Sequence, residues 1–511
     1  MRLGNILKST SKKSAIFISY ASLLLSTFSS IFLTRILLQI MGSAQYGLYQ
    51  MIYSVAHYVM ILDMGISTVM IRYMSEYRAK GDLKGEQNVA AIVAILVAAA
   101  SVIVVAAGFV IRANIAGIYT TLTPEEVEIS QTMILIMTAQ FVLTIYSHYL
   151  HGSIQSREYF AFTSFVGAVD VIVSFGMTAL FAWLGMGCVG IALANLLAVL
   201  LLSTVESYVL FGRIRFRVKL TRWDWRVIRP IGGLMLAMLL QSVVGHVNSF
   251  VDKTLLGMFC RKEDVTVYSL SATVLTMVNT LPGIVSGFFQ PQVTRMIVKK
   301  ASASELTDLV IRVGRWQFIL LGAVLGAFGL FGRHFVTLWA GEEFAAMAWL
   351  IVMIIIVPNM VPLIQSVCIS IMNGYDKRLY RSLILAGMTV LNVILSVILI
   401  RRFGPLGAPV GTAIAYILGD IFALNIYYAK RIHLEVGRMF RAILHKTWLA
   451  VIGATALSAV FLLIPTVNLL TFLGECVGFV AVYGVLLYFF ALNTEEKNFV
   501  RSLIRRLLKM A

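Results

Sequence analysis

Long apolar runs, each about the length of a membrane-spanning helix, repeat along the whole chain. An α-helix needs about 20 mostly apolar residues to cross a bilayer, and fourteen segments meet that requirement. They are 14–40, 46–71, 87–111, 129–152, 159–184, 188–212, 229–259, 266–294, 307–331, 345–372, 379–401, 406–429, 446–465 and 467–492. The polar interruptions are too short for a water-soluble domain. We therefore expect an all-α polytopic membrane protein with about 14 transmembrane helices.

The composition leads to the same class. Of the 511 residues, 59% are hydrophobic and 13% are charged, whereas a globular protein carries roughly 25% charged residues. Lipid must therefore be the solvent for most of the chain. The four cysteines are far apart and have neither disulfide nor metal-site spacing, so we expect no metal site.

Lys and Arg are distributed unevenly between the two sides of the predicted membrane. With residues at span ends counted in the adjoining loop, 32 fall on the side of the N-terminus, 6 on the other side and 4 within spans. Cytoplasmic loops carry an excess of Lys and Arg, so both termini are expected to be cytoplasmic. This asymmetry also explains the net charge of +18 without a nucleic-acid partner.

The two halves of the chain resemble each other at a nearly constant offset. Four pairs of matching positions are 218 to 221 residues apart: Arg35 and Lys253, Asp63 and Pro282, Tyr159 and Tyr380, and Ala192 and Ala413. Coincidence among repetitive apolar segments is the alternative to a true repeat. Each repeat holds six spans, and because six is even both repeats have the same orientation. We expect two parallel six-helix repeats that face a central cavity, plus two extra C-terminal helices.

The repeat divides the chain into five regions. They are an N-terminal six-helix bundle (1–212), a basic cytoplasmic linker (213–228), a C-terminal six-helix bundle (229–431), two additional transmembrane helices (432–493) and a basic amphipathic cytoplasmic tail (494–511). Three glycine pairs at i, i+4 spacing predict close helix–helix approach: Gly283 and Gly287, Gly322 and Gly326, and Gly407 and Gly411.

Polar residues follow two adjacent lanes along span 229–259. One lane comprises Gln241, Gly245, Asn248 and Asp252, and the other comprises Ser242, His246, Ser249 and Lys253. A charge at the bilayer centre costs at least about 2.5–3.5 kcal/mol, so this face is expected to line an aqueous cavity. Solvation of the two charged residues at the outer surface is the alternative.

Arg35 and Lys253 occupy equivalent positions in the two repeats. Two cations facing one cavity would suit an anionic group such as phosphate, whereas snorkelling to the outer headgroups is the alternative. The candidate substrate-binding residues are Arg35, Lys253, His246, Asn248, Gln241 and Ser249.

Four carboxylates also lie within predicted spans: Asp63, Asp170, Asp252 and Asp420. Intramembrane carboxylates relay protons or bind sodium ions, and structural pairing is the alternative. We therefore expect coupling to H+ or Na+, with movement down the gradient of the lipid-linked substrate as the alternative, and no other cofactor. The chain has no P-loop motif, so direct use of ATP is not expected.

Three stretches resemble a known family: LLQIMGSAQYGLY at 37–49, LDMGISTVMIRY at 62–73 and VTLWAGEEF at 336–344. They are similar to the polysaccharide-transporter family of bacterial oligosaccharide flippases, within the multidrug/oligosaccharidyl-lipid/polysaccharide exporter superfamily. The resemblance implies a protein that flips a polyprenyl-pyrophosphate-linked oligosaccharide across the cytoplasmic membrane by alternating access. Such proteins serve O-antigen, capsule, exopolysaccharide or teichoic-acid biosynthesis.

The resemblance also implies the surroundings of the protein. We expect a monomer in the bacterial cytoplasmic (inner) membrane, whose partners are the lipid-linked glycan, membrane lipids and other polysaccharide-assembly proteins. In related lipid-linked flippases, two spans after the twelfth help to receive the lipid tail, and the last two spans here match that pair.

Two other functions remain as alternatives. A multidrug exporter of the same superfamily normally has twelve spans. A membrane-embedded glycan polymerase or ligase would place its catalytic groups on a long outer loop, and the longest one here, 112–128, offers little room. We therefore expect a transporter with no catalytic residues rather than an enzyme.

Overall fold

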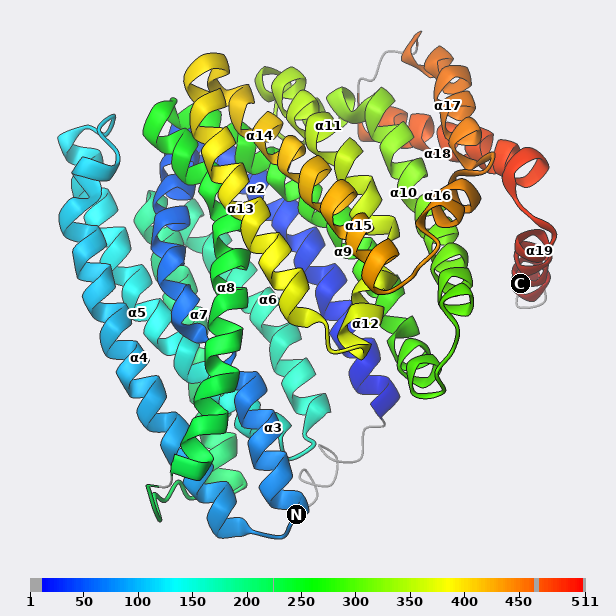
Figure 1. The fold of residues 1–511 in the computed structure, drawn as a ribbon. Coiled ribbons are helices and arrows are strands. Elements are labelled where there is room, and N and C mark those ends of the chain that lie inside the picture. The colour runs from blue at the N-terminus through cyan, green and yellow to red at the C-terminus, as the bar shows by residue number, and fades with distance from the viewer. Residues whose placement is uncertain (1–11, 224, 464–467, 509–511) are drawn as a thin grey trace. The chain divides into compact units, whose positions relative to one another are not determined.

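The structure is a computed structural model that describes residues 12–223, 225–463 and 468–508 (Figure 1). Within those ranges it contains helices and no β-strand. The chain forms two compact units: unit 1 comprises Met1–Ser269 and Ile400–Pro405, and unit 2 comprises Leu270–Leu399 and Leu406–Ala511. The five regions expected from the repeat stay a prediction.

The described residues of unit 1 form seven α-helices before the start of α9, and two short helical segments. They are α2 (Lys12–Ala56), the 3-10 helix η1 (His57–Asp63), α3 (Ile66–Ala79), α4 (Leu83–Ile118), α5 (Pro124–Gln155), α6 (Phe160–Trp183), α7 (Gly187–Ser207), the π-helix η2 (Tyr208–Arg213) and α8 (Trp225–Phe259).

Helix α9 (Lys262–Val298) begins in unit 1 and continues into unit 2. The following elements are α10 (Ala303–Trp339), α11 (Glu342–Ile364), α12 (Ser366–Gly374), α13 (Arg378–Phe403), η3 (Gly404–Leu406), α14 (Gly407–Tyr416), η4 (Ile417–Ala423), α15 (Leu424–Arg431), α16 (Val436–Leu444), α17 (Thr447–Ser458), η5 (Ala459–Leu463), α18 (Leu469–Leu486), η6 (Leu487–Ala491) and α19 (Thr494–Leu508).

Twelve helical regions among the described residues are long and apolar enough to cross a membrane. Two of them, Ala21–Ala79 and Tyr380–Arg431, are 59 and 52 residues long, and each holds two of the spans expected from the sequence. Helices therefore occupy all fourteen expected spans, although residues 464–467 at the junction of the last two lie outside the description. The all-α polytopic fold class is confirmed.

Glycine conformations account for the division of the first long region. Gly42 interrupts α2 with φ 77° and ψ 170°, at the expected junction between the first two spans. The second span is itself broken, because η1 ends at Asp63 and is followed by Met64 and Gly65 with φ 48° and 64°. A broken helix in a membrane protein requires other protein groups or water to satisfy its backbone, so this break marks a polar region.

The segments expected on the cytoplasmic side of unit 1 lie together at one end. The carboxylate of Glu86 in α4 forms a buried ion pair with Arg157, whose guanidinium lies 4.0 Å from the ring centroid of Phe216 in the linker. The backbone N of Thr221 donates to Oδ1 of Asn88 at 2.9 Å. The linker is thereby fixed to the ends of α4 and α5.

Segments expected on the opposite side also meet. Lys262 forms an ion pair with Glu126, and Oγ1 of Thr266 donates to the carbonyl oxygen of Ser43 at 2.7 Å. The alternation of the loops between two ends in unit 1 thus agrees with the sequence. Which end faces the cytoplasm stays a prediction.

In unit 2 the two extra helices α17 and α18 pack against α10. A Cβ added at Gly322 would lie 2.7 Å from Cγ2 of Val451, and one at Gly326 would lie 2.6 Å from Cζ of Phe479. The Tyr483 hydroxyl donates to the carbonyl oxygen of Ile319 at 3.0 Å. The two glycines allow the close approach that their spacing predicts.

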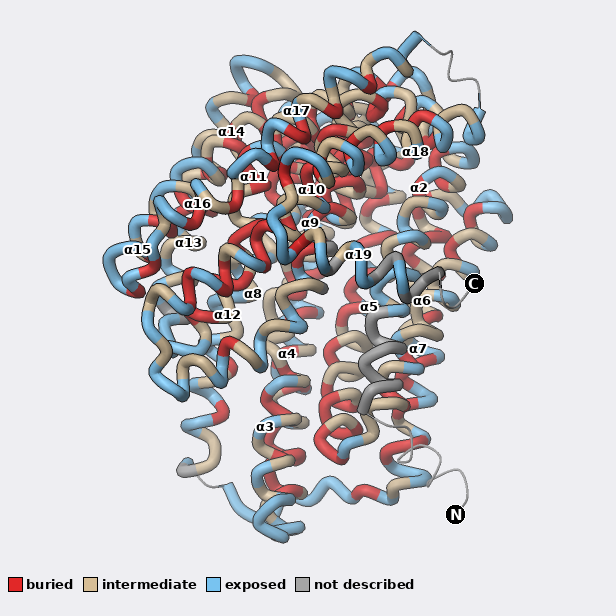
Figure 2. The backbone as a smooth tube through the Cα atoms, turned by 90° about the vertical axis from the view of Figure 1, so that its right-hand side faces the viewer, coloured by how far each residue is buried: buried red, intermediate tan, exposed pale blue. Residues whose placement is uncertain are grey.

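The other glycine predictions have mixed outcomes. A Cβ at Gly411 would lie 2.8 Å from Oγ of Ser396, so close packing is confirmed there. The prediction is wrong for Gly283, where an added Cβ meets nothing within 4 Å. Buried backbone alternates with exposed backbone along most helices (Figure 2), and many exposed side chains are large and apolar, as expected for helices surrounded by lipid.

Candidate functional site

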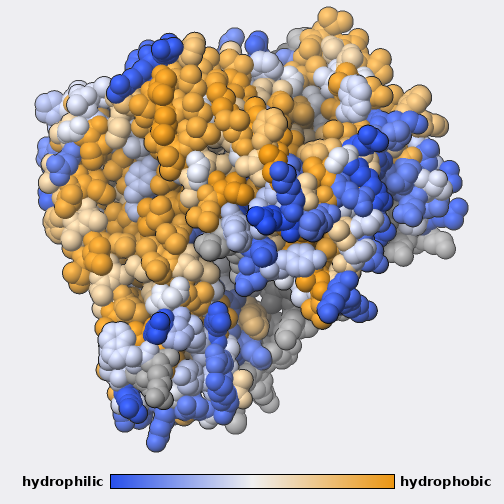
Figure 3. Space-filling view, in the orientation of Figure 1, coloured by the Kyte–Doolittle hydropathy of each residue, from blue (hydrophilic) through white to orange (hydrophobic). Residues whose placement is uncertain are grey.

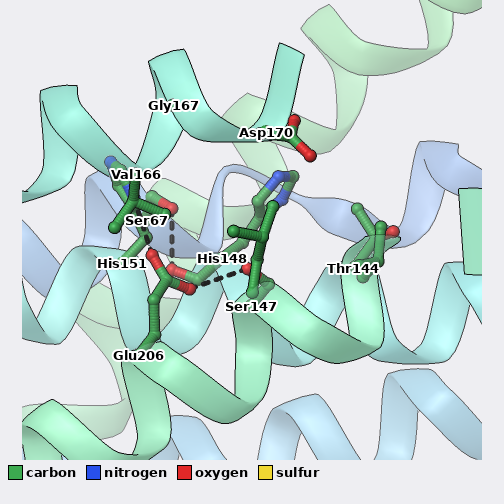
Figure 4. A pocket seen from close by; sticks show the side chains of 11 residues that line it. Ser67, Thr144, Ser147, His148, His151, Val166, Gly167, Asp170 and Glu206 are labelled. Atoms are coloured by element: carbon green, nitrogen blue, oxygen red, sulfur yellow. Dashed lines mark hydrogen bonds and ion pairs between the residues drawn. The ribbon is translucent and has the colours of Figure 1, made fainter. Parts of the chain in front are cut away.

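Unit 1 encloses a cavity of about 360 Å³ among α3, α5, α6 and α7 (Figure 4). Seven of its eleven lining residues are polar or titratable, and such side chains are costly at a lipid-facing surface. The lining residues are Ser67, Thr144, Ser147, His148, His151, Val166, Gly167, Asp170, Val199, Leu202 and Glu206.

One histidine of the cavity is paired with the carboxylate at the helix break. Nδ1 of His148 lies 2.7 Å from Oδ1 of Asp63. The hydroxyl of Ser67, in the first turn of α3, donates to the backbone carbonyl of His148 at 2.7 Å. Side chains and backbone on both sides of the break are therefore bound to the same turn of α5.

A second histidine–carboxylate pair lies one turn further along α5. The Ser147 hydroxyl donates to Oε2 of Glu206 at 2.9 Å, and Nδ1 of His151 lies 3.2 Å from Oε1. Both α5 residues share one face because they are four positions apart. The Glu206 side chain is 1% exposed, so its charge is held by these two partners. It lies two residues before the π-helical segment η2, a geometry often found at functional sites.

Asp170 is a further carboxylate near the two pairs, and it lines the cavity together with Glu206. It accepts a hydrogen bond from the Ser174 hydroxyl at 3.3 Å. Figure 4 shows its carboxylate on the side of the cavity toward which the His148 ring points. The cluster thus combines three carboxylates with two imidazoles, an arrangement that can take up and release protons by exchanging hydrogen bonds.

The described residues contain no group of three or more His, Cys, Asp or Glu arranged to hold a metal ion. In the cavity, each histidine instead faces one carboxylate.

The structure divides the polar lanes of α8 into two parts. Gln241, Asn248 and Ser249 are exposed, and His246 is half-buried. Ser249 donates to the carbonyl oxygen of Gly245 at 2.8 Å. This part of α8 exposes polar groups, and the aqueous cavity that they are expected to line stays a prediction.

The last turns of the lanes are held by neighbouring helices. Nζ of Lys253 donates to Oε1 of Gln50 in α2 at 3.1 Å. Oδ2 of Asp252 accepts a hydrogen bond from the Tyr268 hydroxyl at 2.6 Å, and Asp252 is buried. Arg35 is exposed on α2. That Arg35 and Lys253 face one shared cavity stays a prediction.

Asp420 lies in unit 2, buried in the π-helix η4. Its backbone carbonyl accepts from Nδ2 of Asn425 at 3.3 Å, and Oδ1 of Asn425 accepts from Nε2 of Gln365 at 2.7 Å. Gln365 stands at the break between α11 and α12. The amide pair at this break thus occupies a place like that of the Asp63–His148 pair at the break in unit 1.

Sequence reasoning named Asp63 and Asp170 but missed His148, His151 and Glu206. The signal was present, because two histidines at i, i+3 lie in span 129–152 and a glutamate lies in span 188–212. Intramembrane ionisable residues are functional candidates, but only the packing of α5 against α7 shows which ones are partners.

Comparison with known proteins supplies a family for this architecture. The family described as "Polysaccharide biosynthesis protein" matches residues 12–296. No curated protein sequence matches the chain.

Solved structures share the fold. A structure titled "Lipid II flippase MurJ, inward closed conformation" has a TM-score of 0.73 at 13% identity and covers 96% of this chain and 100% of its own. Inward-facing and outward-facing structures of a multidrug resistance MATE family transporter of the MOP superfamily have TM-scores of 0.64 and 0.57, each at 15% identity. They cover 81% and 86% of this chain, and 96% and 98% of their own.

Proposed function

Because the chain belongs to the polysaccharide biosynthesis protein family, we propose that it flips a polyprenyl-pyrophosphate-linked oligosaccharide from the inner to the outer leaflet of the cytoplasmic membrane. The product would feed the assembly of a cell-surface polysaccharide. The protein is a multi-pass membrane protein of transporter-like fold, and the substrate is the proposed part.

The pair α17 and α18 is the observation that carries this proposal. The lipid II flippase structure covers 96% of the chain, whereas the two multidrug transporter structures cover 81% and 86%. The larger coverage is expected if the extra helix pair has a counterpart in a lipid-substrate flippase. Both helices expose large apolar side chains, including Leu457, Val477 and Val480, which suit contact with a long lipid tail.

The polar head of such a substrate must cross about 30 Å of hydrocarbon. Polar groups that replace its lost hydration lower that barrier. In the proposal, the exposed lane of α8 (Gln241, Asn248 and Ser249) together with His246 contacts the glycan, and Arg35 and Lys253 contact the pyrophosphate. The Lys253–Gln50 bond would then be exchanged for a bond to the substrate.

We also propose that the cavity of unit 1 couples flipping to an ion gradient. Asp63 and Asp170 are the coupling carboxylates, with His148, His151 and Glu206 as partners. A histidine nitrogen already faces one oxygen of Asp63 and of Glu206, which favours H+ over Na+ because sodium prefers all-oxygen coordination. Asp252 and Asp420 stay predictions as coupling residues.

The test is complementation of bacterial strains that each lack one flippase and accumulate one lipid-linked intermediate. Expression of this chain should clear the intermediate and restore surface polymer in the strain whose glycan it accepts. The variant Glu206→Gln, produced at equal level, should restore less, because it alters the proposed coupling cluster. Restored resistance to cationic drugs with no change in any lipid-linked intermediate would instead identify a multidrug exporter.

A further inference from the structure

A second cavity, of about 530 Å³, lies in unit 2 where α10, α16 and η6 meet. Five of its lining residues are basic, and none of the eleven lining residues is Asp or Glu. The lining residues are Ile311, Arg315, Arg438, Arg441, Ala442, His445, Lys446, Phe490, Ala491, Leu492 and Asn493. This site is separate from the polar cavity of unit 1 and plays no part in the proposed flipping step.

Two of the basic residues are already neutralised. Arg315 forms two bonds with Glu496, Nε–Oε1 at 2.7 Å and Nη2–Oε2 at 3.0 Å. Arg438 contacts Asp308 at 2.6 Å and Glu435 at 3.0 Å. Because Arg315 is only 6% exposed, this paired arginine forms the fixed inner wall of the cavity.

Arg441, His445 and Lys446 remain without such compensation. All three are exposed, and in the described ranges none of them forms an ion pair. Lys446 has φ 59°, and α17 begins directly after it without a side-chain cap. The helix N-terminus therefore adds its partial positive charge to that of Lys446. The cavity carries a net positive charge that nothing within it offsets.

The cavity also has apolar lining residues in addition to the basic ones. Phe490 lines the cavity and is 68% exposed, and Trp448, which follows the loop into α17, is 47% exposed. Basic side chains beside exposed aromatic rings are typical of the headgroup level of a bilayer. Figure 3 shows hydrophilic side chains gathered around α16 and α19, next to a hydrophobic surface.

We propose that this cavity binds the phosphate group of an anionic phospholipid. Arg441 and Lys446 contact the phosphate oxygens, and the acyl chains lie along Phe490 and Trp448. Basic pockets of this kind at the membrane surface recognise anionic headgroups. A bound lipid would connect α16 to the start of α17, and so stabilise the position of the two extra helices.

The experiment measures lipid binding to the delipidated full-length protein by native mass spectrometry. The probes are phosphatidylglycerol, phosphatidylcholine and inorganic phosphate. The test variant is Arg441→Gln/Lys446→Gln, and Arg441→Lys preserves the charge. The matched control is Lys430→Gln/Arg431→Gln, which removes two exposed cations of α15 that do not line the cavity. Gel-filtration profiles and melting temperatures confirm that each variant is folded.

Each cation near an anionic headgroup contributes about fivefold in affinity. Phosphatidylglycerol should therefore bind the double variant about 30-fold more weakly than the wild type, with phosphatidylcholine unchanged. Arg441→Lys and the α15 control should retain wild-type binding. The proposal is overturned if the double variant binds phosphatidylglycerol like the wild type. It is also overturned if the α15 control loses as much affinity for phosphatidylglycerol as the double variant does. Inorganic phosphate that binds as tightly as phosphatidylglycerol would assign the cavity to a soluble anion and also overturn it.

Discussion

Asp63 and His148 are 85 positions apart in the chain, yet Nδ1 of the histidine lies 2.7 Å from Oδ1 of the aspartate. Asp63 is the last residue of η1, and α3 begins only after two residues with positive φ. The pair therefore connects α5 to the point where the second span has no continuous helical hydrogen bonding. In the proposed coupling, a change in the charge of this pair acts directly on the break and so alters the shape of the span.

Asp63→Asn is expected to uncouple transport from the proton gradient. The amide retains the shape and one hydrogen bond to His148, but it cannot take up a proton. A charge-assisted hydrogen bond contributes about 1.5–3 kcal/mol, so the gradient-driven rate should fall tenfold or more. Flipping of a fluorescent lipid-linked oligosaccharide in proteoliposomes, with and without an imposed pH difference, measures this effect.

The matched control for that measurement is Asp82→Asn. Asp82 caps the start of α4 by accepting from the backbone N of Gly85 at 2.8 Å, and it does not line the cavity. This variant should respond to the pH difference like the wild type. An Asp63→Asn protein that also keeps its full response would remove Asp63 from the coupling mechanism.

Glu206→Gln tests the second pair independently. The glutamine side chain can still bond with Ser147, but the negative charge beside His151 is lost. We expect the protein to remain folded, with a gradient-driven rate at least tenfold lower. Glu158→Gln, at an exposed loop position, is the control in the same assay. Equal rates for the wild type and Glu206→Gln would reduce this cluster to a structural role.

Arg35→Ala and Lys253→Ala examine the proposed pyrophosphate contacts. Each should weaken apparent substrate affinity about tenfold or more, while Lys253→Arg keeps part of the activity because the charge remains. Substrate titration in the flipping assay measures the change. Because Arg35 is exposed and Lys253 is bonded to Gln50, the two losses should be unequal, with Lys253 the larger. If both alanine variants show wild-type affinity, recognition must lie lower on α8, around His246 and Asn248.

Hydropathy was enough to predict the spans because lipid imposes a simple rule on every helix it surrounds. The spacing of small residues predicted the close approach at Gly322 and Gly326. Hydropathy did not predict the break after Asp63, because the sequence there remains apolar on both sides and only Gly65 indicates a left-handed conformation. Backbone conformation at such a point depends on its tertiary contacts, here those of Asp63 with the His148 ring and of Ser67 with the His148 carbonyl.

The candidate site was predictable only in part for the same reason. Asp63 and Asp170 were identified by being charged within spans. Their partners belong to other spans, and no spacing along the chain relates His151 to Glu206, which are 55 positions apart. Helix packing decides which of these residues pair. The residue spacing in a single sequence does not predict that packing.

The orientation of the protein has a direct test. Reporter fusions after residues 120 and 340 should report the outside, and fusions after 80, 220 and 511 the inside, because the 32 Lys and Arg on the expected cytoplasmic side hold those loops there. Alkaline phosphatase and green fluorescent protein fusions give opposite readouts and control for each other. One reversed loop in the middle of the chain would contradict the parallel repeat.

The buried pair of Glu86 and Arg157 should matter for stability rather than for transport. Their exposed fractions are 3% and 5%. Burial lowers the pKa of the Arg157 guanidinium, and the Glu86 carboxylate acts against that shift. Glu86→Gln leaves the arginine buried without a counter-charge, which costs about 3 kcal/mol. Thermal unfolding of the purified protein should therefore begin at a clearly lower temperature.

Two variants separate this effect from a general loss of charge. Glu86→Gln combined with Arg157→Met should recover most of the stability, because a buried pair replaced by apolar groups of similar volume is often neutral. Glu76→Gln breaks the exposed pair with Lys80, whose atoms lie 2.7 Å apart, and should leave the melting temperature unchanged. If Glu86→Gln melts like the wild type, then Phe216 and the Ser153 carbonyl, which accepts from Arg157 at 3.1 Å, are sufficient to hold the guanidinium, and the linker does not depend on the ion pair.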